Sequence, residues 1–149
     1  MNAREETHKH IRNVQRFLHE VACLLVQRGE FHDKTKLESP EVEIFDEFTS
    51  KLKATTYGSP EYNEYLKQMG PALKHHYENN RHHPEHFDSG VNDMTLIDIM
   101  EMLCDWKAAT LRHADGDIMQ SIEKNKERFG LSSQLTQVLK NTVERLEWD

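Results

Sequence analysis

A dense group of histidines lies in the middle of the chain, in the segment HHYENNRHHPEHF from His75 to Phe87. Five of the ten histidines in the sequence fall within it. Histidine is the commonest metal ligand and has an unperturbed pKa near neutrality. The group as a whole therefore predicts a metal site or a proton relay, whereas any single one of these histidines is more typical of a surface or core residue.

The five histidines differ in the structure expected around them. His75 and His76 follow a Gly-Pro break and are predicted on a short helix, where neighbouring side chains point about 100° apart and only one can face inward. His82 and His83 are predicted in a loop, where two neighbouring side chains can be directed separately. His86 is interpreted as a surface residue.

A sixth histidine faces inward on the first predicted helix. The segment from Glu5 to Arg28 has an apolar stripe, and His10 lies within roughly 30° of the centre of that stripe, on the side that a helix buries. The stripe is formed by Ile11, Val14, Leu18, Val21 and Leu25. The alternative to a ligand at this position is a core histidine with a satisfied hydrogen bond.

The next polar motif is the dipeptide His32-Asp33, which follows the end of this helix. Adjacent residues on a helix point about 100° apart, so both can bind one ion only from a particular local geometry. Alternatively, Asp33 caps a turn and has no ligand role.

The third motif is a stripe of acids in the segment LIDIMEMLCDWKAATLR. Asp98, Glu101 and Asp105 share one narrow side of a helix that is apolar on most of its circumference. The stripe is either the only solvent-exposed side of this helix or one wall of an interior site. Burying stacked carboxylates costs several kcal/mol unless a cation is present, so an interior stripe predicts a bound cation.

The residue types indicate which metals would bind. Imidazole and carboxylate ligands without thiolate suit manganese, iron, cobalt, nickel or zinc in an open catalytic site, and we expect one or two such divalent ions. A closed structural zinc site would more often use cysteines. The two cysteines, Cys23 and Cys104, lie in apolar segments and are predicted to be reduced core residues.

Composition narrows the class of partner. The formal net charge of −7 excludes the basic surface that duplex nucleic acid requires, although a bound cation would still allow a small anionic substrate. The sequence has no apolar run long enough to span a membrane, and its start, MNAREETHKH, lacks the apolar core of a signal peptide. We therefore expect a cytoplasmic protein that does not bind membranes.

The elements that must position these motifs are helices. Residues 1–149 are predicted to form a single all-α domain, a bundle of about six to seven helices with a motif-bearing core at about 8–113 and C-terminal helices at about 117–146. Serine N-caps followed by proline are expected at Ser39-Pro40 and Ser59-Pro60. The C-terminal apolar stripes are interpreted as core, with a homodimer contact as the alternative. After the first helix, the expected helices are Ser39–Ala54, Ser59–Met69, a short one from Gly70, Met94–His113, Asp117–Phe129 and Ser133–Leu146.

In this order, the motifs resemble those of the HD superfamily of metal-dependent phosphohydrolases, which have an all-helical core. The matching residues are His10, His32-Asp33 and Asp105, and HDKTK is similar to the family's His-Asp-x-x-Lys with Lys36 in the lysine position. The chain resembles most closely a group of short HD-like phage and bacterial proteins with a His-Asp-x-Ser-Lys start, a His-His…Arg-Asn-x-His-His middle and a Glu-Met-x-x-Asp-Trp helix. The corresponding segments here are HDKTK, HHYENNRHH and EMLCDW.

The resemblance implies an HD-domain-like core and a set of roles. His10, His32, Asp33 and Asp105 would hold one divalent ion. A second metal position, or protonation of the leaving oxygen, would fall to His76, His82 and His83, among which the assignment stays open. Glu101 would orient a ligand or act as a general base, and Lys36 and Arg81 would neutralise the substrate phosphate.

The function expected from these features is removal of phosphate from a small phosphoester, with a nucleotide as the expected substrate, by attack of a metal-bound hydroxide. Two alternatives belong to other classes. One is a di-iron oxygenase of the HD type, which would use the additional histidines as ligands. The other is a non-enzymatic helical binding or inhibitor protein that is stabilised by a metal.

Overall fold

The chain forms a single all-helical domain, as the sequence predicts. The computed structural model describes residues 2–55, 59–112 and 114–148, and within these ranges it contains seven α-helices and three short 3-10 helices but no strand. The α-helices are α1 (Ala3–Phe31), α2 (Glu41–Ala54), α3 (Pro60–Gln68), α4 (Gly70–Asn79), α5 (Leu96–Thr110), α6 (Ile118–Phe129) and α7 (Ser133–Arg145). The 3-10 helices are η1 (Lys34–Leu37), η2 (Pro84–His86) and η3 (Gly90–Asp93).

Most helix boundaries follow local signals in the sequence. The Ser59 hydroxyl accepts a hydrogen bond from the backbone N–H of Tyr62 and Pro60 opens α3, as predicted. Asp117 caps α6, and Gly130 ends it in the left-handed conformation with φ 63°. These caps depend only on neighbouring residues, which is why the sequence was sufficient to place them.

Several predicted boundaries differ from the structure: the first helix runs from Ala3 to Phe31 rather than from Glu5 to Arg28, and α5 begins at Leu96 rather than at Met94. Ser39 is not an N-cap, because α2 begins at Glu41 and its N-cap residue is Pro40, which has no side-chain hydrogen bond to offer. The fifth helix ends at Thr110, and the expected end at His113 lies outside the described residues.

The hydrophobic core lies between the three C-terminal helices. Trp106 of α5 stacks on Phe129 of α6 with ring centroids 6.3 Å apart. This confirms the interpretation of the C-terminal stripes as core. The buried cluster consists of Met102, Leu103, Trp106, Ile118, Ile122, Leu131, Leu139 and Val143.

The two cysteines do not belong to this core, so that prediction was wrong. Cys23 and Cys104 are both exposed. Cys23 lies on α1, on the side away from its apolar stripe, and Cys104 lies on a side of α5 that does not face α6 and α7. An apolar surrounding sequence did not distinguish the buried side of either helix from its exposed side.

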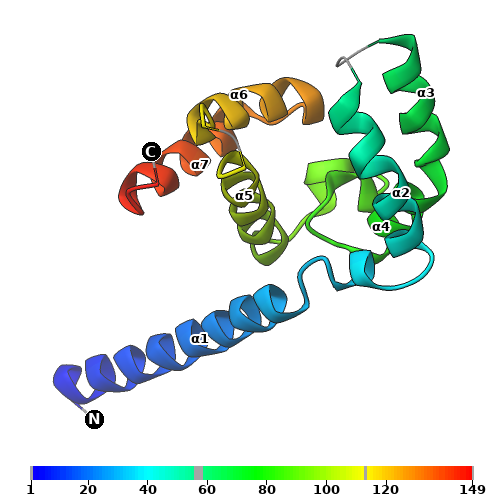
Figure 1. Ribbon diagram of the computed structural model, residues 1–149. Coiled ribbons are helices and arrows are strands. Elements are labelled where there is room, and N and C mark those ends of the chain that lie inside the picture. Colours follow the sequence, from blue (N-terminus) through cyan, green and yellow to red (C-terminus); the bar gives the residue numbers. More distant parts are fainter. Residues whose placement is uncertain (1, 56–58, 113, 149) are drawn as a thin grey trace.

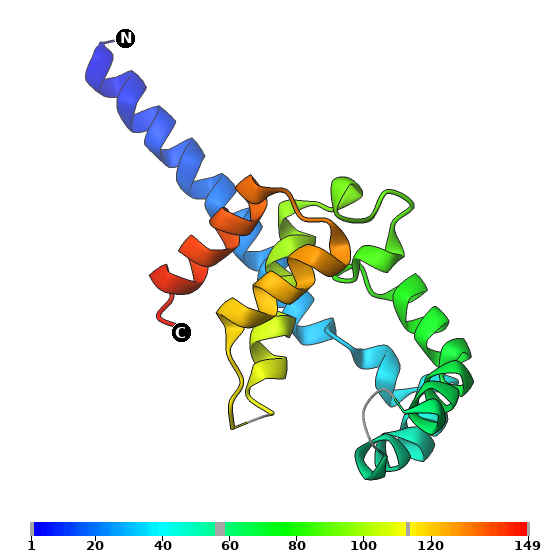
Figure 2. The same cartoon turned by 90° about the horizontal axis from the view of Figure 1, so that it is seen from above.

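The first helix projects away from the rest of the domain (Figures 1 and 2). It is continuous over 29 residues, and every residue from Asn2 to Leu24 is exposed. Its contacts with the body are made by its last turns, which pack against α5. Helices α2, α3 and α4 form a second group of helices, and the end of α1 and helix η1 connect this group to α5 (Figure 1).

No helix in the described ranges is long and apolar enough to cross a membrane.

Candidate metal centre

Four separate segments deliver polar side chains to one place between the two groups of helices. The end of α1 and the turn after it supply His32 and Asp33, whereas α4 supplies His76. The loop after α4 supplies His82 and His83, and α5 supplies Glu101 and Asp105.

The His32-Asp33 pair adopts the particular local geometry that two neighbouring ligands need. Helix α1 ends at Phe31, so His32 is its C-cap residue, and Asp33 has a left-handed backbone with φ 55°. Aspartate tolerates this conformation better than most residues because its short side chain can bond locally. The reversal of the chain directs both side chains into the same cluster from different angles.

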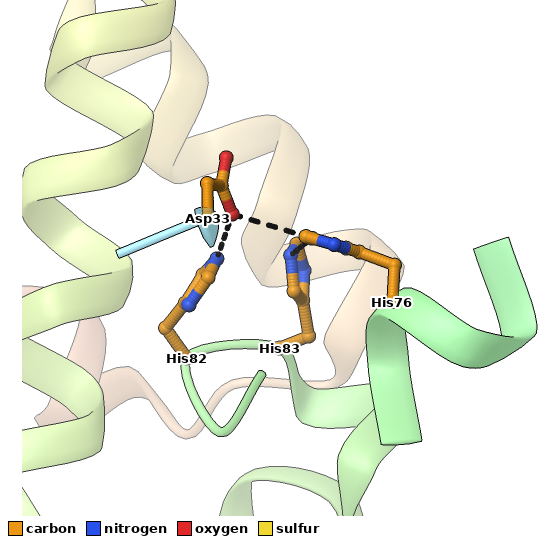
Figure 3. A group of neighbouring side chains, drawn as sticks. All are labelled: Asp33, His76, His82 and His83. Atoms are coloured by element: carbon orange, nitrogen blue, oxygen red, sulfur yellow. Dashed lines mark hydrogen bonds and ion pairs between the residues drawn. The ribbon is translucent and has the colours of Figure 1, made fainter. Parts of the chain in front are cut away.

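One half of the cluster is centred on a single carboxylate oxygen (Figure 3). Oδ1 of Asp33 lies 3.3 Å from Nε2 of His76 and 3.4 Å from Nε2 of His82. Nε2 of His76 lies 2.9 Å from Nε2 of His83. One oxygen and three imidazole nitrogens therefore face one another in a volume of the size of a metal coordination shell.

The other half of the cluster is built around His32. Its Nε2 lies 3.5 Å from Oδ2 of Asp33 and 3.4 Å from Oδ1 of Asp105. Two sets of side chains thus have ligand atoms within 4.8 Å of one another: Asp33, His76, His82 and His83, and His32, His82 and Asp105. Ligands on opposite sides of a transition metal are separated by roughly 4 Å, so both sets have suitable dimensions.

His82 is common to both sets but has a single nitrogen directed at them. Its Nδ1 lies 3.1 Å from Oε1 of Glu101, so only Nε2 is available to a metal. The two oxygens of Asp33, by contrast, face different sets and can bridge two positions. The cluster can therefore hold one ion, or two ions of which only one has His82 as a ligand.

Two carboxylates outside the cluster fix the orientation of its imidazoles. Oε1 of Glu101 lies 2.9 Å from Nδ1 of His32 and also binds His82, and Oε2 of Glu41 lies 2.9 Å from Nδ1 of His76. An ionised carboxylate only accepts hydrogen bonds, so each of these Nδ1 atoms donates. In a neutral imidazole the lone pair then resides on Nε2, which faces the cluster. This arrangement is typical of metal-binding histidines.

Two buried polar atoms in the cluster have no hydrogen-bond partner within the described residues. They are Oδ1 of Asp33 and Nε2 of His82, and both are directed at the position a metal would take. Leaving a buried donor or acceptor unsatisfied costs about 1–3 kcal/mol. A cation coordinated by both atoms would remove this cost, so the residues present fit a divalent metal.

The ionisation states also suit a cation site. Burial raises the pKa of Asp33, but the contacts of this carboxylate with His76 and Lys36 outweigh the effect of burial and hold that pKa well below the ordinary value. Burial also raises the pKa of Glu101, but hydrogen bonds donated by His32, His82 and Arg28 outweigh burial and hold that pKa below its ordinary value. Burial and the neighbouring His82 lower the pKa of His83 to about 3, which leaves its imidazole neutral and able to ligate.

His32 behaves differently from His83. Hydrogen bonds to Asp105 and Glu101 raise its pKa to about 10 despite partial burial. A metal would therefore displace a proton from His32 when it binds, since only the neutral ring can ligate.

Most residues expected from the sequence come together here. His32, Asp33, His76, His82, His83 and Asp105 form the cluster. The acidic stripe of α5 faces the interior rather than solvent, with the Asp98 side chain 1% exposed.

Two of the expected roles are not supported by the structure. His10 is exposed on the projecting part of α1, and the 22 positions that separate it from His32, the C-cap residue of that helix, correspond to roughly 33 Å, so the structure does not bring it to the cluster. Arg81 binds both oxygens of Asp98 at 3.1 Å instead of facing the cluster. By contrast, His82 belongs to both candidate ligand sets and Glu101 contacts two imidazoles, which agrees with one of the two roles expected for each.

Lys36 lies at the edge of the cluster. Its Nζ is 2.6 Å from Oδ2 of Asp33, and its side chain is 38% exposed. It therefore holds one ligand in place and is also accessible from solvent.

Sequence reasoning missed two residues that shape the site. Glu41 is fully buried and binds both His75 and His76. Arg28 binds Asp98 at 2.8 Å and Glu101 at 2.5 Å. Glu41 gave no local signal of this role, because an acid in the first turn of a helix is common. The sequence did contain a signal for Arg28, because it lies at the next heptad position after Leu25, and a charged residue on the apolar side of a helix predicts a buried partner of opposite charge.

A cleft leads to the cluster from the side where α1 crosses α5. It has a volume of about 320 Å³, within the range of small-molecule sites. His32 and Asp105 reach it from the cluster, whereas several of its other lining side chains are apolar. The lining residues are Leu25, Arg28, Gly29, His32, Met100, Glu101, Cys104, Asp105 and Ala108.

Comparison with known proteins gives one match. Residues 1–145 match the model of DUF5662, which is described as a family of unknown function. Neither the curated proteins nor the solved structures include a match to the chain.

Proposed function

We propose that this chain, which belongs to the family DUF5662, is a metal-dependent phosphohydrolase that removes phosphate from a small phosphoester such as a nucleotide. The observation that carries the proposal is the convergence of histidine Nε2 atoms and carboxylate oxygens, with Oδ1 of Asp33 and Nε2 of His82 buried and without a hydrogen bond among the described residues. A purely structural hydrogen-bond network would satisfy such atoms.

The donor set supports a catalytic rather than a closed structural site. It combines imidazoles with Asp33 and Asp105 and contains no thiolate, since Cys104 lies in the cleft and outside both sets. A divalent ion in such a site acidifies a water ligand and polarises a phosphoryl oxygen.

The residues around the cluster have roles that follow from their contacts. Glu101 and Glu41 hold three imidazoles so that their Nε2 atoms face inward, which prepares the site before a metal binds. Lys36 neutralises Asp33 and is exposed enough to meet a phosphate oxygen. Arg28 lines the cleft and would face the anionic substrate beside the metal.

The cleft sets the class of substrate. Its volume of about 320 Å³ accepts a small molecule but not a folded macromolecule. Leu25, Met100 and Ala108 give it an apolar wall, which suits the flat face of a nucleobase or another apolar group. The phosphate would then lie at the end formed by His32 and Asp105.

A di-iron oxygenase is a second candidate, because two overlapping ligand sets share Asp33 and can accommodate two ions. The two functions differ in their metal and in their need for oxygen. A metal-stabilised protein without activity is the third outcome.

Elemental analysis followed by turnover assays distinguishes these functions. Tag-free wild type, Asp105→Ala and the matched control Asp115→Ala, an exposed loop acid, would be analysed for metal. Each protein, loaded with manganese, cobalt, nickel or zinc, would then be assayed for phosphate release from nucleotides and p-nitrophenyl phosphate. We expect roughly one or two equivalents of metal and metal-dependent phosphate release, both lost only in Asp105→Ala.

The other results would contradict the proposal in different ways. Iron with oxygen-dependent turnover would favour the oxygenase. A metal that raises the melting temperature without any turnover across the panel would favour a structural ion. A folded protein that binds neither iron nor manganese, cobalt, nickel or zinc would refute both catalytic functions.

A further inference from the structure

The N-terminal part of the apolar stripe of α1 is left exposed by the described residues of the domain. Helix α1 extends away from the body in both views, and no other helix lies along its N-terminal part (Figures 1 and 2). Large apolar side chains on this part are about half exposed: Ile11 44%, Val14 41%, Phe17 53%, Leu18 62%, Val21 43% and Leu24 49%. In proteins most of the stability of a helix comes from the packing of its apolar face, so the projecting part needs a partner surface.

The spacing of the stripe is that of a coiled-coil seam. Ile11, Val14, Leu18, Val21 and Leu25 alternate at intervals of three and four residues, the heptad pattern of helices that pack side by side. The same face continues to Arg28 and His32, whose side chains contact α5. The stripe is therefore the packing face of α1, of which only the last turns are used within one chain.

The charged residues of α1 would not oppose the pairing of two identical α1 helices along their apolar stripes. Between Thr7 and Leu25 the formally charged residues lie on the outer side of the helix, at Lys9, Arg12, Arg16 and Glu20. The positions that flank the seam are His8, Gln15 and Ala22 on one side and His10, Phe17 and Leu24 on the other. No like charges would therefore face each other across a pair of identical helices, and Phe17 and Leu24 would add apolar contact.

The exposed area has the size that a stable association requires. Six apolar side chains, each about half exposed, present on the order of 600 Å², which is the upper end of the largest patches on monomeric proteins. A standard interface buries about 800 Å² per partner, which this stripe and its flanking side chains would approach.

We propose that the partner is a second copy of this chain, with the two α1 helices packed antiparallel along their apolar stripes. The direction follows from the position of the body. Helix α5 packs on the stripe side of α1 at its C-terminal end, so a parallel partner would bring its own body into the same space. In the antiparallel arrangement the two bodies lie at opposite ends of the helix pair.

The heptad pattern also gives the register. When Val14 lies opposite the partner's Leu18, Ile11 lies opposite the partner's Val21, and all four apolar residues outside the body are paired. Thr7 then lies beside the partner's Leu25, which lines the cleft near the metal cluster. The N-terminal turns of each helix therefore form part of the surroundings of the other chain's cleft.

Oligomeric state and stability test the proposal. Wild type, Leu18→Glu and the matched control His19→Glu, which places the same charge on the polar side of the helix about 100° away, would be compared by analytical ultracentrifugation. We expect dimers for wild type and His19→Glu and a monomer for Leu18→Glu, with a dissociation constant at least about 100-fold weaker. Circular dichroism would verify that the body stays folded, as expected for a substitution at a side chain that is 62% exposed in one chain.

A distance measurement tests the direction of the helices. A spin label at Glu6→Cys, with Cys23 and Cys104 replaced by serine, would lie roughly 30 Å from its counterpart along an antiparallel pair and about 10 Å away in a parallel pair.

Three results would overturn the proposal. A wild-type monomer at concentrations up to hundreds of micromolar would leave the stripe to a lipid surface or another protein. A dimer that is unaffected by Leu18→Glu would be formed by a different surface. Labels about 10 Å apart would show a parallel pair.

Discussion

Glu101 gives the sharpest test of the metal centre, because one carboxylate orients two candidate ligands. Its Oε1 accepts hydrogen bonds from Nδ1 of His32 at 2.9 Å and Nδ1 of His82 at 3.1 Å, two residues that are 50 positions apart in the chain and on different elements. Glu101→Gln keeps the volume but removes the charge. The side-chain amide nitrogen of the new glutamine would also face the Arg28 guanidinium, and because both groups are donors the hydrogen bond between these side chains would be lost.

The expected magnitude follows from the number of ligands that are released. Loss of one residue that orients a ligand typically costs 10–100-fold in metal affinity. Glu101 holds two members of the ligand sets, so Glu101→Gln should weaken binding by about 100-fold, close to 2.7 kcal/mol. Glu41 holds His76 and the non-ligand His75, so Glu41→Gln should weaken it by about 10-fold.

The assay is a competition titration with a chromophoric chelator, using cobalt or zinc near neutral pH. Glu43→Gln is the matched control, because Glu43 is an exposed acid on the same helix as Glu41 and should bind metal as wild type does. Melting curves of the metal-free proteins would separate a loss of affinity from a loss of folding. Affinities within about threefold of wild type for Glu101→Gln, or a larger loss for Glu41→Gln, would refute this account of how the ligands are oriented.

Three further outcomes are expected. Asp98→Asn removes the buried charge that pairs with Arg28 and Arg81. It should lower the free energy of unfolding, measured by urea denaturation, by about 3 kcal/mol. Burial raises the pKa of Asp98, but the hydrogen bonds donated by Arg81, Thr95 and Arg28 outweigh burial and leave that pKa below its ordinary value. The stabilisation of the folded state by the Asp98 carboxylate is therefore present above about pH 4 and should be lost as the pH falls below that value. Ile122→Ala, at a fully buried position, should lower the free energy of unfolding by about 2–5 kcal/mol. The control Leu96→Ala, at a position 78% exposed, should change it by less than about 0.5 kcal/mol. Equal effects of the two substitutions would contradict the core described above. A chelator should lower the melting temperature of the metal-loaded protein, because removal of a metal held at 100 times its dissociation constant costs about 2.7 kcal/mol of folding stability. In calorimetry, Asp33→Asn should show no such shift in melting temperature. The control Asp88→Asn, at an exposed position, should show the same shift as wild type.

The sequence alone determined the helices, because their signals are local. Apolar periodicity and the caps at Ser59, Asp117 and Gly130 involve residues within one or two turns of each other. The acidic stripe on α5 was recognisable in the same way, since three carboxylates on an otherwise apolar helix require an explanation wherever the helix lies. The histidine cluster was visible as composition, without an assignment of individual ligands.

Tertiary structure decided which residues meet. His32 binds Glu101 across 69 positions of sequence, and His76 binds Glu41 across 35, and no local pattern specifies such pairings. Glu41 became a buried partner of two histidines only because α4 packs against the start of α2.

The first helix shows this division most clearly. Its heptad stripe is determined by the sequence, and so is the inward direction of His10 relative to that stripe. What the stripe packs against is a property of the folded chain: the body covers only the last turns of α1, and His10 lies on the part that extends beyond it. Periodicity identifies the side of a helix that is to be buried, whereas the neighbour that buries it is set by contacts between distant segments or separate chains.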